Sequence, residues 1–386
     1  PGADVPAPWP LDGPATRGHD PRGRGPVDPD DIAARFDLGP DDDPPPAPYE
    51  QDDPPRGRAA GPGPRGPVAG RWWTVPLAAL LLLGWVSSVF VDVGGLLGVL
   101  PVTLATTAPF VTVLAVPVAT LAVRRRRWES LVAALVAGAL PWAFVLGYAS
   151  ADPPPADAGA AVTVLVVNAH DGRADAAEIV AAVRSHDVDV LVVTELSRTL
   201  THELTEARLA TFLAPQWFDV EDAPDEGLGV WSRLDLAGTA LVPGTTWPAV
   251  SLQVQTRAGD LTVVAGHVVP PVPSDVDDWR SDLEALGAAV RGKERTLLAG
   301  SFNASPWHAQ YRRLLGTTLV DAADVQGAGL RPTWPAWTPL PLVPLDSALV
   351  TKDLRVVSAD TVPVQDTDHR ALLVSLEVPG DLRSGD

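Results

Sequence analysis

The feature that most restricts how this chain can fold is a long, almost uncharged stretch between residues 72 and 148. A helix needs roughly 20 mostly apolar residues to cross the hydrocarbon core of a bilayer. The region 71–150 therefore predicts three transmembrane helices, at about residues 75–93, 96–123 and 131–148. Four prolines lie inside these runs, and we expect kinks at them because membrane helices tolerate proline where neighbours satisfy the freed carbonyl groups: Pro101, Pro109, Pro117 and Pro141.

The arginines around these runs predict how the chain is oriented. Four consecutive arginines at 124–127 separate the second run from the third, and Arg65 and Arg71 precede the first. Loops rich in Lys and Arg stay on the cytoplasmic side of a membrane. We therefore expect a multi-pass protein of the cell membrane, with its N-terminus in the cytoplasm and everything after residue 148 outside the cell. Aromatic residues at the run ends favour the headgroup region and support the boundaries: Trp72, Trp73, Trp128 and Tyr148.

Two other interpretations of the apolar region fit less well. A buried helical core of a soluble protein is possible, but three long uncharged runs favour the membrane. A transporter would need ionisable residues within the spans. Asp92 and Glu129 lie only at the span ends, so we expect neither to mark an ion path.

The segments around the apolar region differ sharply in composition. Residues 1–70 are rich in Pro and Asp, as in DDDPPP at 41–46, and we expect a disordered tail because such a segment buries too little surface to offset its ordering entropy. A proline motif that binds a partner remains the alternative. Residues 151–160 (ADPPPADAGA) predict a stiff linker, and residues 161–379 a folded domain.

Charge and composition exclude several classes of function for the domain. The chain has no Cys, which rules out disulfides, Cys-ligated zinc, iron–sulfur clusters and thiol nucleophiles. From residue 151 onward there are 33 acidic and 17 basic residues, which contribute -16 of the formal net charge of -19. Nucleic-acid binding relies on basic residues that neutralise phosphates. A nucleic-acid partner is therefore not expected.

Short apolar runs in the domain each deliver a polar residue at their C-terminal end. The runs 162–167, 189–193, 261–266 and 296–300 read as buried strands. Asp175 and Glu178 form a capping box for one helix, and residues 278–291 have the apolar spacing of another. We expect an α/β domain with layered sheets and a site at the strand ends. The polar residues that follow these strands or lie later in the chain are Asn168, Glu195, His267, Ser301, Asn303, Asp346, Asp368 and His369.

These residue types favour phosphate-ester hydrolysis. A carboxylate can hold Mg²⁺, amides can hydrogen-bond phosphoryl oxygens, and a His–Asp pair can transfer a proton or stabilise charge. The chain contains no G-x-S-x-G elbow, P-loop, Rossmann fingerprint or H-E-x-x-H motif. Those enzyme classes are therefore not supported.

The order of these motifs resembles that of the endonuclease/exonuclease/phosphatase superfamily, to which DNase I-like nucleases, sphingomyelinases and inositol phosphatases belong. The motifs are the strand that ends in Asn168, DVDVLVVTELS, GLGVWSR, the strand that ends in His267, LLAGSFNASPWH, PLDSALV and TDHRALL. The resemblance implies a two-sheet α/β sandwich and dependence on Mg²⁺ or Mn²⁺. Three spans followed by an external domain are also similar to the membrane-bound branch that includes teicoplanin-resistance proteins.

The resemblance also implies a role for each site residue. Glu195 would bind the metal, with Asp368 as a further carboxylate on the metal side. Asn168 would orient phosphate or a metal-bound water.

Three further positions match catalytic groups of the superfamily. His267 and Asn303 would contact the scissile phosphate. Asp346 would pair with the terminal histidine, His369. Each site residue also has a structural explanation: a surface carboxylate for Glu195, caps for Asn168 and Asn303, a core histidine for His267 and an exposed one for His369.

Two positions depart from the superfamily pattern. The G-D-F-N motif reads Gly-Ser-Phe-Asn, so Ser301 stands where a carboxylate is expected, and Ser347 replaces a common His. Loss of that carboxylate could remove a general-base contribution of about 10² to 10⁴ in rate. Either Asp171 or Asp324 could substitute, or the chain is a binding or sensing module with impaired catalysis.

A few other residues remain open. Four histidines have no matching partners and are expected at the surface or behind the site: His170, His186, His202 and His308. Trp334 and Trp337 are either packing residues or an apolar lip at the pocket, and Asn303-Ala304-Ser305 forms a sequon where the site is expected. From the sequence we expect an external, membrane-anchored, metal-dependent phosphodiesterase or phosphatase acting on a lipid-linked or small phosphorylated substrate.

Overall fold

The computed structural model describes residues 95–143, 145–146, 159–214, 216–220, 225–325, 327 and 330–380. The predicted N-terminal tail, the first predicted span and most of the predicted linker lie outside the described residues.

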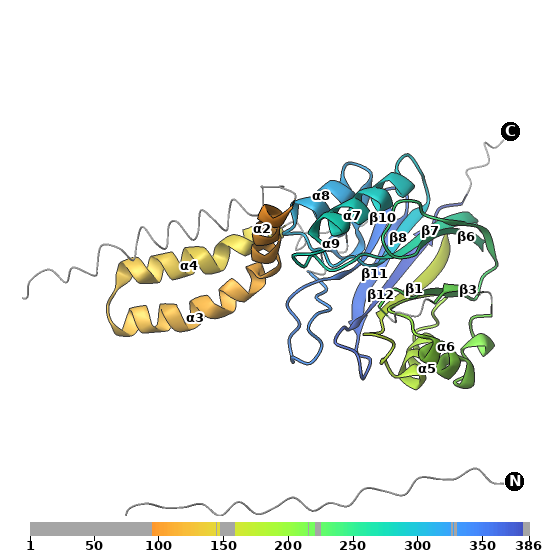
Figure 1. The fold of residues 1–386 in the computed structure, drawn as a ribbon, viewed down its shortest axis with the longest axis horizontal. Coiled ribbons are helices and arrows are strands. Elements are labelled where there is room, and N and C mark those ends of the chain that lie inside the picture. Colours follow the sequence, from red (N-terminus) through yellow and green to blue (C-terminus); the bar gives the residue numbers. More distant parts are fainter. Residues whose placement is uncertain are drawn as a thin grey trace, which may run out of the picture. The chain divides into compact units, whose positions relative to one another are not determined.

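Two six-stranded sheets form the body of the domain (Figure 1). The strands β1 and β2 of the first sheet run parallel, as do β7 and β8 of the second, and the other neighbours are antiparallel. In spatial order the first sheet contains β11 (Arg355–Val362), β12 (Ala371–Val378), β1 (Ala160–Asn168), β2 (Val190–Thr194), β4 (Leu228–Ser232) and β3 (Gln216–Asp219). The second contains β5 (Leu236–Leu241), β6 (Ala249–Thr256), β7 (Gly259–His267), β8 (Thr296–Ser301), β10 (Asp346–Thr351) and β9 (Leu319–Asp321).

Helices cover the outer face of each sheet. The first sheet packs against α5 (Ala176–Ser185) and α6 (Arg198–Glu206), which the short 3₁₀ turn η3 (Leu209–Thr211) follows. The second packs against α7 (Val276–Val290) and α8 (Ala309–Leu315), and α9 (Ala322–Val325) follows β9. Asp175 caps α5 by accepting hydrogen bonds from the amides of Ala177 and Glu178, as predicted. The Glu178 carboxylate, however, accepts from Gln365 instead of closing the capping box on the Asp175 amide, which donates to the Gln365 carbonyl. The prediction of a two-sheet α/β domain is confirmed.

The alternation of side chains along β1 explains its continuous apolar sequence. Val162, Val164 and Val166 pack between the two sheets, whereas Leu165 and Val167 pack under the helices. Successive side chains of a strand point to opposite faces, and both faces of this strand are covered. From Val164 onward every side chain of the strand is buried, whereas the earlier Ala161 is exposed and Thr163 is half-buried.

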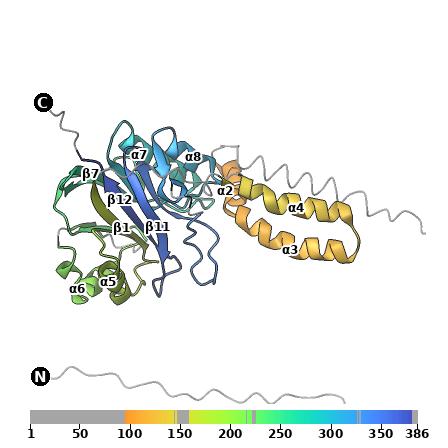
Figure 2. The ribbon, with the colours of Figure 1, turned by 180° about the vertical axis from the view of Figure 1, so that it is seen from behind.

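The apolar region contains three described helices, which differ from the predicted spans. They are α2 (Leu96–Thr106), α3 (Ala108–Arg124) and α4 (Trp128–Ala143). Figure 2 shows α3 and α4 side by side. In this part of the chain, no single helix has both the length and the apolar content needed to cross a membrane, although α2 and α3 together have them.

The second predicted span is not one continuous helix, because the chain bends by 62° between α2 and α3. Pro109 lies in the first turn of α3, where its missing N–H costs no helical hydrogen bond and its fixed φ favours a new helix. Before the bend, Val102 of α2 is buried in the apolar cluster that contains Trp279 of α7. The helix α2 thus packs against the α/β domain.

Candidate active site

The strand ends bring the predicted site residues to one edge of the two sheets. In the first sheet, Asn168 is in register with Thr194, the residue before Glu195. In the second, Ser301 pairs with His267 on one side and with Asp346 on the other. Since the two sheets pack face to face, these ends form a single polar cluster above the apolar core.

The carboxylate of Glu195 is the centre of this cluster. Its Oε1 accepts a hydrogen bond from Asn168 Nδ2 at 2.8 Å, and its Oε2 accepts one from the amide of Asp171 at 2.8 Å. Burial raises the pKa of Glu195, and these two hydrogen bonds offset only part of that effect. The Glu195 carboxylate is therefore already oriented, and a bound cation would offset the remaining cost of burying its charge.

His267 faces Glu195 from the second sheet. Its Nε2 lies 3.7 Å from Glu195 Oε1, and its Nδ1 donates to the carbonyl oxygen of Asp225 at 3.0 Å. Because a carbonyl can only accept, the hydrogen of the neutral ring is on Nδ1. Burial lowers the pKa of His267 to about 4, so the ring is neutral near pH 7 and its Nε2 lone pair faces the cluster. The indole of Trp247 packs on the ring at 4.5 Å between centroids.

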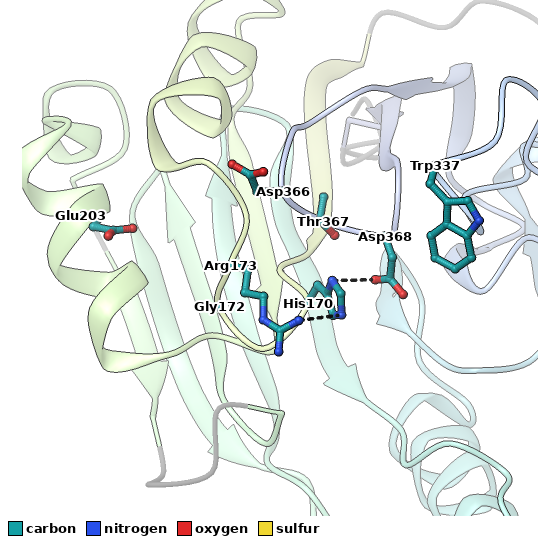
Figure 3. Close-up of a pocket in the computed structure, with 8 residues that line it drawn as sticks. All are labelled: His170, Gly172, Arg173, Glu203, Trp337, Asp366, Thr367 and Asp368. Atoms are coloured by element: carbon teal, nitrogen blue, oxygen red, sulfur yellow. Dashed lines mark hydrogen bonds and ion pairs between the residues drawn. The ribbon is translucent and has the colours of Figure 1, made fainter. Parts of the chain in front are cut away.

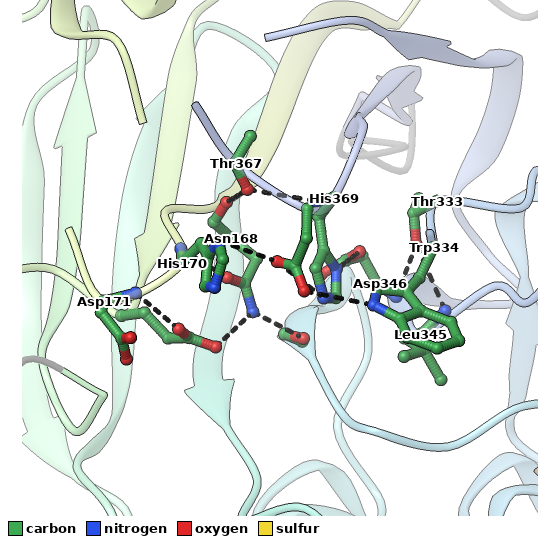
Figure 4. A network of polar contacts seen from close by, with 12 residues as sticks. Asn168, His170, Asp171, Thr333, Trp334, Leu345, Asp346, Thr367 and His369 are labelled. Carbon is green, nitrogen blue, oxygen red and sulfur yellow. Dashed lines mark hydrogen bonds and ion pairs between the residues drawn. The ribbon is translucent and has the colours of Figure 1, made fainter. Parts of the chain in front are cut away.

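Asp346 and His369 form a buried pair on the other side of the cluster (Figure 4). His369 Nδ1 donates to Asp346 Oδ2 at 2.6 Å. Burial alone would lower the pKa of His369, but the charge and hydrogen bond of Asp346, with the charges of Asp368 and Glu195, raise it above its ordinary value. The raised pKa favours the imidazolium form, and the hydrogen bond to Asp346 directs Nε2 away from that carboxylate.

Two threonines fix this pair. The Thr333 hydroxyl accepts hydrogen bonds from the amides of Leu345 and Asp346, at 3.2 and 3.3 Å. The Thr367 hydroxyl accepts one from the His369 amide at 3.1 Å and donates to the Asn168 carbonyl at 2.8 Å. Thr367 thus ties the TDH turn to the end of β1 (Figure 4).

Asp368 connects the cluster to a surface pocket. Its Oδ1 lies 3.5 Å from His170 Nδ1 and 3.9 Å from His369 Nε2, and its Oδ2 accepts from Trp334 Nε1 at 3.2 Å. The pocket, of about 630 Å³, is shown in Figure 3 and is lined by His170, Gly172, Arg173, Glu203, Trp337, Asp366, Thr367 and Asp368. Trp337 packs edge-on against Trp334 and is 67% exposed.

The segment that corresponds to the G-D-F-N motif of the superfamily contains Gly300, Ser301 and Asn303, with Ser301 in place of the Asp. Ser301 is fully buried, and its hydroxyl accepts a hydrogen bond from Asn168 Nδ2 at 3.3 Å. Asn303 has a φ of 48° and donates from Nδ2 to the Val268 carbonyl at 2.9 Å. A Cβ at Gly300 would lie 1.8 Å from the Gly266 carbonyl oxygen, so this position accepts only glycine.

The cluster offers few direct ligands for a metal. Within the described residues, no three His, Asp or Glu side chains come close enough to hold an ion by themselves. Mg²⁺ commonly binds through one or two carboxylates and keeps several waters. Glu195, with its raised pKa, fits that mode, whereas a fully protein-ligated site does not.

The structure brings most of the predicted residues together. Asn168, Glu195, His267 and Ser301 form one set of contacts, and Asp346, Asp368 and His369 form the other. Asn303 lies beside them but does not cap α8, whose N-cap residue is His308.

Asp171 and Asp324, the two carboxylates that could substitute for the Asp missing at Ser301, differ in their distance from the cluster. The backbone of Asp171 contacts Glu195, but its carboxylate pairs with Arg173 Nη2 at 3.1 Å. Asp324 has no described contact with the cluster.

Sequence reasoning missed several residues of the site. The half-buried His170 and the buried His308 agree with the expected position at the surface or behind the site, but the contact of His170 with Asp368 was not predicted. The sequence does not predict the roles of Trp247, Thr333 and Thr367. Only Thr367, in the TDH motif, offers a signal, because a hydroxyl before a turn often bonds the backbone two residues on.

Comparisons with known proteins agree with this fold. Residues 165–369 match the family model described as "Endonuclease/Exonuclease/phosphatase family". No curated protein matches the chain. Similar solved structures include humanized D. rerio TDP2 (12% identity, TM-score 0.48, 56% of this chain and 99% of that one) and the endonuclease/exonuclease/phosphatase from Beutenbergia cavernae (21%, 0.45, 57% and 72%). A family protein from Bacteroides thetaiotaomicron is 14% identical, with a TM-score of 0.44 over 57% of this chain and 99% of that one. The matched residues span more than half of the chain and contain the whole polar cluster, and the chain therefore belongs to the endonuclease/exonuclease/phosphatase family.

Proposed function

We propose that this protein is a membrane-anchored hydrolase of phosphoric esters whose catalytic domain lies outside the cell. The observation that supports hydrolysis most directly is the arrangement of the two halves of the cluster. A buried, hydrogen-bonded carboxylate lies in one half, and a carboxylate-paired imidazolium lies in the other. A phosphoryl group between them would meet hydrogen-bond donors on the Asn168 and His369 sides.

Each residue of the chain has a definite task in this proposal. The imidazolium of His369 donates from Nε2 to a phosphoryl oxygen, because Nδ1 is bonded to Asp346. Neutral His267 accepts a proton or hydrogen bond at Nε2, since its Nδ1 hydrogen is bonded to Asp225. Asn303 orients the group through its amide. Both Nδ2 hydrogens of Asn168 are bonded to Glu195 and Ser301, so Asn168 acts by fixing these two side chains.

We propose that Glu195 holds Mg²⁺ or Mn²⁺, with Asp368 on the same side. When bound, such an ion polarises a phosphoryl oxygen. The hydrogen bonds from Asn168 and the Asp171 amide fix the carboxylate for this purpose.

The membrane part of the proposal rests on the surfaces of α3 and α4. Soluble proteins rarely expose large contiguous apolar patches. Arginines 124–127 follow α3, so the two helices would enter the bilayer with this turn on the cytoplasmic side. The exposed apolar side chains of α3 and α4 include Val113, Leu114, Val116, Val118, Trp128, Val132 and Leu135.

A lipid-linked or small phosphorylated ester is the proposed substrate. The acidic domain disfavours polyanions, and the pocket at Asp368 has an exposed indole, Trp337, on its rim. An apolar substituent of the ester would cover this indole. The membrane-bound branch of the family, which includes teicoplanin-resistance proteins, has the same proposed layout.

Replacing Trp337 tests the pocket. We expect Trp337→Ala to raise the KM for a long-chain alkyl p-nitrophenyl phosphate about tenfold, because contact with one large apolar side chain is worth that much affinity. The KM for the methyl ester and kcat should change little. Trp128→Ala, which removes an exposed indole at the start of α4, is the matched control. An equal change for both esters would contradict an apolar subsite.

Hydrolysis itself is tested on the full chain in lipid nanodiscs, with bis(p-nitrophenyl) phosphate and Mg²⁺ or EDTA. We expect slow, Mg²⁺-dependent turnover by the wild type. Ser301→Asp should raise kcat by about 10², since it restores a carboxylate beside Asn168 at the position of a general base.

The same experiment decides between an enzyme and a binding module. The buried hydroxyl of Ser301 favours the second candidate, a domain that binds phosphorylated ligands without hydrolysing them. Turnover that appears only in Ser301→Asp would support that candidate and contradict the proposed hydrolase.

A further inference from the structure

The loop that carries Asn303 is held from behind by the apolar helices. We define the β8–α8 loop as residues 302–308, between the end of β8 and the start of α8. Six of its side chains are buried: Phe302, Ala304, Ser305, Pro306, Trp307 and His308. Asn303 is the one member that belongs to the catalytic cluster, so the shape of the loop decides where its amide lies.

His308 joins this loop to α2 through a defined chain of hydrogen bonds. Its Nδ1 accepts from the Ser305 amide at 3.0 Å, so the hydrogen of the neutral ring is on Nε2. Nε2 then donates to the Thr106 hydroxyl at 3.0 Å, and that hydroxyl donates to the Val102 carbonyl at 3.0 Å. Burial lowers the pKa of His308 to about 4, which keeps the ring neutral and these directions fixed.

Trp307 joins the same loop to the end of α4. Its indole Nε1 donates to the Pro141 carbonyl oxygen at 2.8 Å, and Trp142 packs edge-on against it at 6.3 Å between centroids. The last carbonyls of a helix have no partner within it, and α4 ends at Ala143, so the Pro141 carbonyl is open to an outside donor. The Trp307 ring lies in one apolar cluster with Ala105 and Ala108.

The other side of the loop faces the site. The Phe302 amide donates to the Leu345 carbonyl at 3.0 Å, next to Asp346, and Trp279 Nε1 donates to the Phe302 carbonyl at 3.2 Å. Asn303 adopts a positive φ, a conformation that a residue keeps only where its surroundings enforce it. The loop therefore has the catalytic cluster on one side and the helices α2 and α4 on the other.

We propose that α2 and α4 are part of the catalytic unit, and that Thr106, Trp307 and His308 are positioning residues that hold Asn303 in place for reaction at the phosphoryl group. The inference rests on the proposed hydrolase function for its effect on rate, but not for its effect on the loop. It gives the apolar helices a task besides anchoring, because any change in how α2 meets the domain alters Asn303. A shift of about 1 Å in a positioning group can lower a rate by up to about 10².

The test uses the full chain in nanodiscs and compares Thr106→Val with wild type. Valine keeps the shape of threonine but removes the hydroxyl that bonds the buried His308 Nε2. We expect amide hydrogen exchange in residues 301–308 to accelerate about tenfold, and kcat for bis(p-nitrophenyl) phosphate to fall about tenfold with little change in KM. Trp307→Phe, which removes the donor to Pro141 together with part of the buried ring, should act in the same direction.

Two control variants separate positioning from general damage. Thr106→Ser keeps the hydroxyl and should restore both the exchange rate and kcat. Thr103→Val makes the same chemical change one turn earlier on α2, where the hydroxyl bonds only to its own helix at Val99, and should behave as wild type.

Unchanged exchange of residues 301–308 in both Thr106→Val and Trp307→Phe would overturn the inference. If wild type hydrolyses nothing, the proposed function fails, whereas the exchange comparison still decides whether the helices hold the loop.

Discussion

Glu195→Gln is expected to abolish hydrolysis while leaving the protein at least as stable as wild type. Glutamine keeps the size of the side chain and an acceptor for Asn168, but it removes the charge proposed to hold the cation. We expect kcat to fall by about 10³, the cost of removing one preorganised electrostatic contact in an enclosed site. The measurement is turnover of bis(p-nitrophenyl) phosphate by the full chain with saturating Mg²⁺.

The stability of this variant should move in the opposite direction to its activity. Burial raises the pKa of Glu195, so above that pKa the ionised carboxylate destabilises the folded state, and the variant lacks this cost. Added Mg²⁺ should raise the Tm of wild type but not of Glu195→Gln, because only a ligand bound to the folded state stabilises it.

The matched control for this prediction is Glu206→Gln on α6. Its carboxylate is exposed and paired only with His202, one turn away on the same helix. An equal Mg²⁺ response of Tm in wild type and Glu195→Gln would contradict the assignment of Glu195 as the metal-binding residue.

Asp346→Asn is expected to lower kcat by about 10² to 10⁴ near neutral pH and to change the pH profile. Burial alone lowers the pKa of His369, and the charge of Asp346 is the largest effect that raises it. Without that charge the pKa of His369 falls, so a smaller fraction of the ring is the imidazolium near pH 7. The variant should therefore gain activity as the pH falls, whereas wild type should keep its activity up to a higher pH.

The same linkage predicts how stability depends on pH. Since the pKa of His369 is higher in the folded state than in the unfolded state, its contribution to stability is full below the ordinary histidine pKa of about 6.5. This contribution is lost as the pH rises through the folded-state pKa. In Asp346→Asn it should be absent, which thermal melts between pH 5 and 9 would detect as a flatter curve. The control is Asp187→Asn, at an exposed turn before β2, which should match wild type. Identical pH profiles for Asp346→Asn and wild type would refute the role of the pair.

Much of the site could be predicted because the sequence marks strand ends directly. A strand buried on both faces is mostly apolar until it ends. Asn168, His267 and Ser301 therefore stand out as polar residues directly after a run, and Glu195 follows Thr194 at the end of another. The resemblance to the family then identified Asp346, Asp368 and His369. The structure places these residues in contacts with one another, while their chemical roles remain to be tested by the variants above.

The partners that fix these residues could not be predicted, because they come from loops whose sequences carry little local signal. Thr333 lies in a loop before β10 and holds Asp346 only because that loop folds back onto the strand end. The Asp225 carbonyl, which sets the tautomer of His267, is a backbone group and has no signature in the sequence at all.

Hydropathy and strand patterns are local properties, and by itself the sequence determined the apolar character of the region before the domain, four of the buried strands and the identity of the polar residues at their ends. Only the tertiary structure decided how these pieces meet, as in the bend between α2 and α3 and the hydrogen bond between Thr106 and His308, 202 residues apart. The physical reason is that an apolar run has the same composition whether lipid, a sheet or another helix covers it. The choice among them depends on shape and on hydrogen bonds that form only after distant parts of the chain have packed.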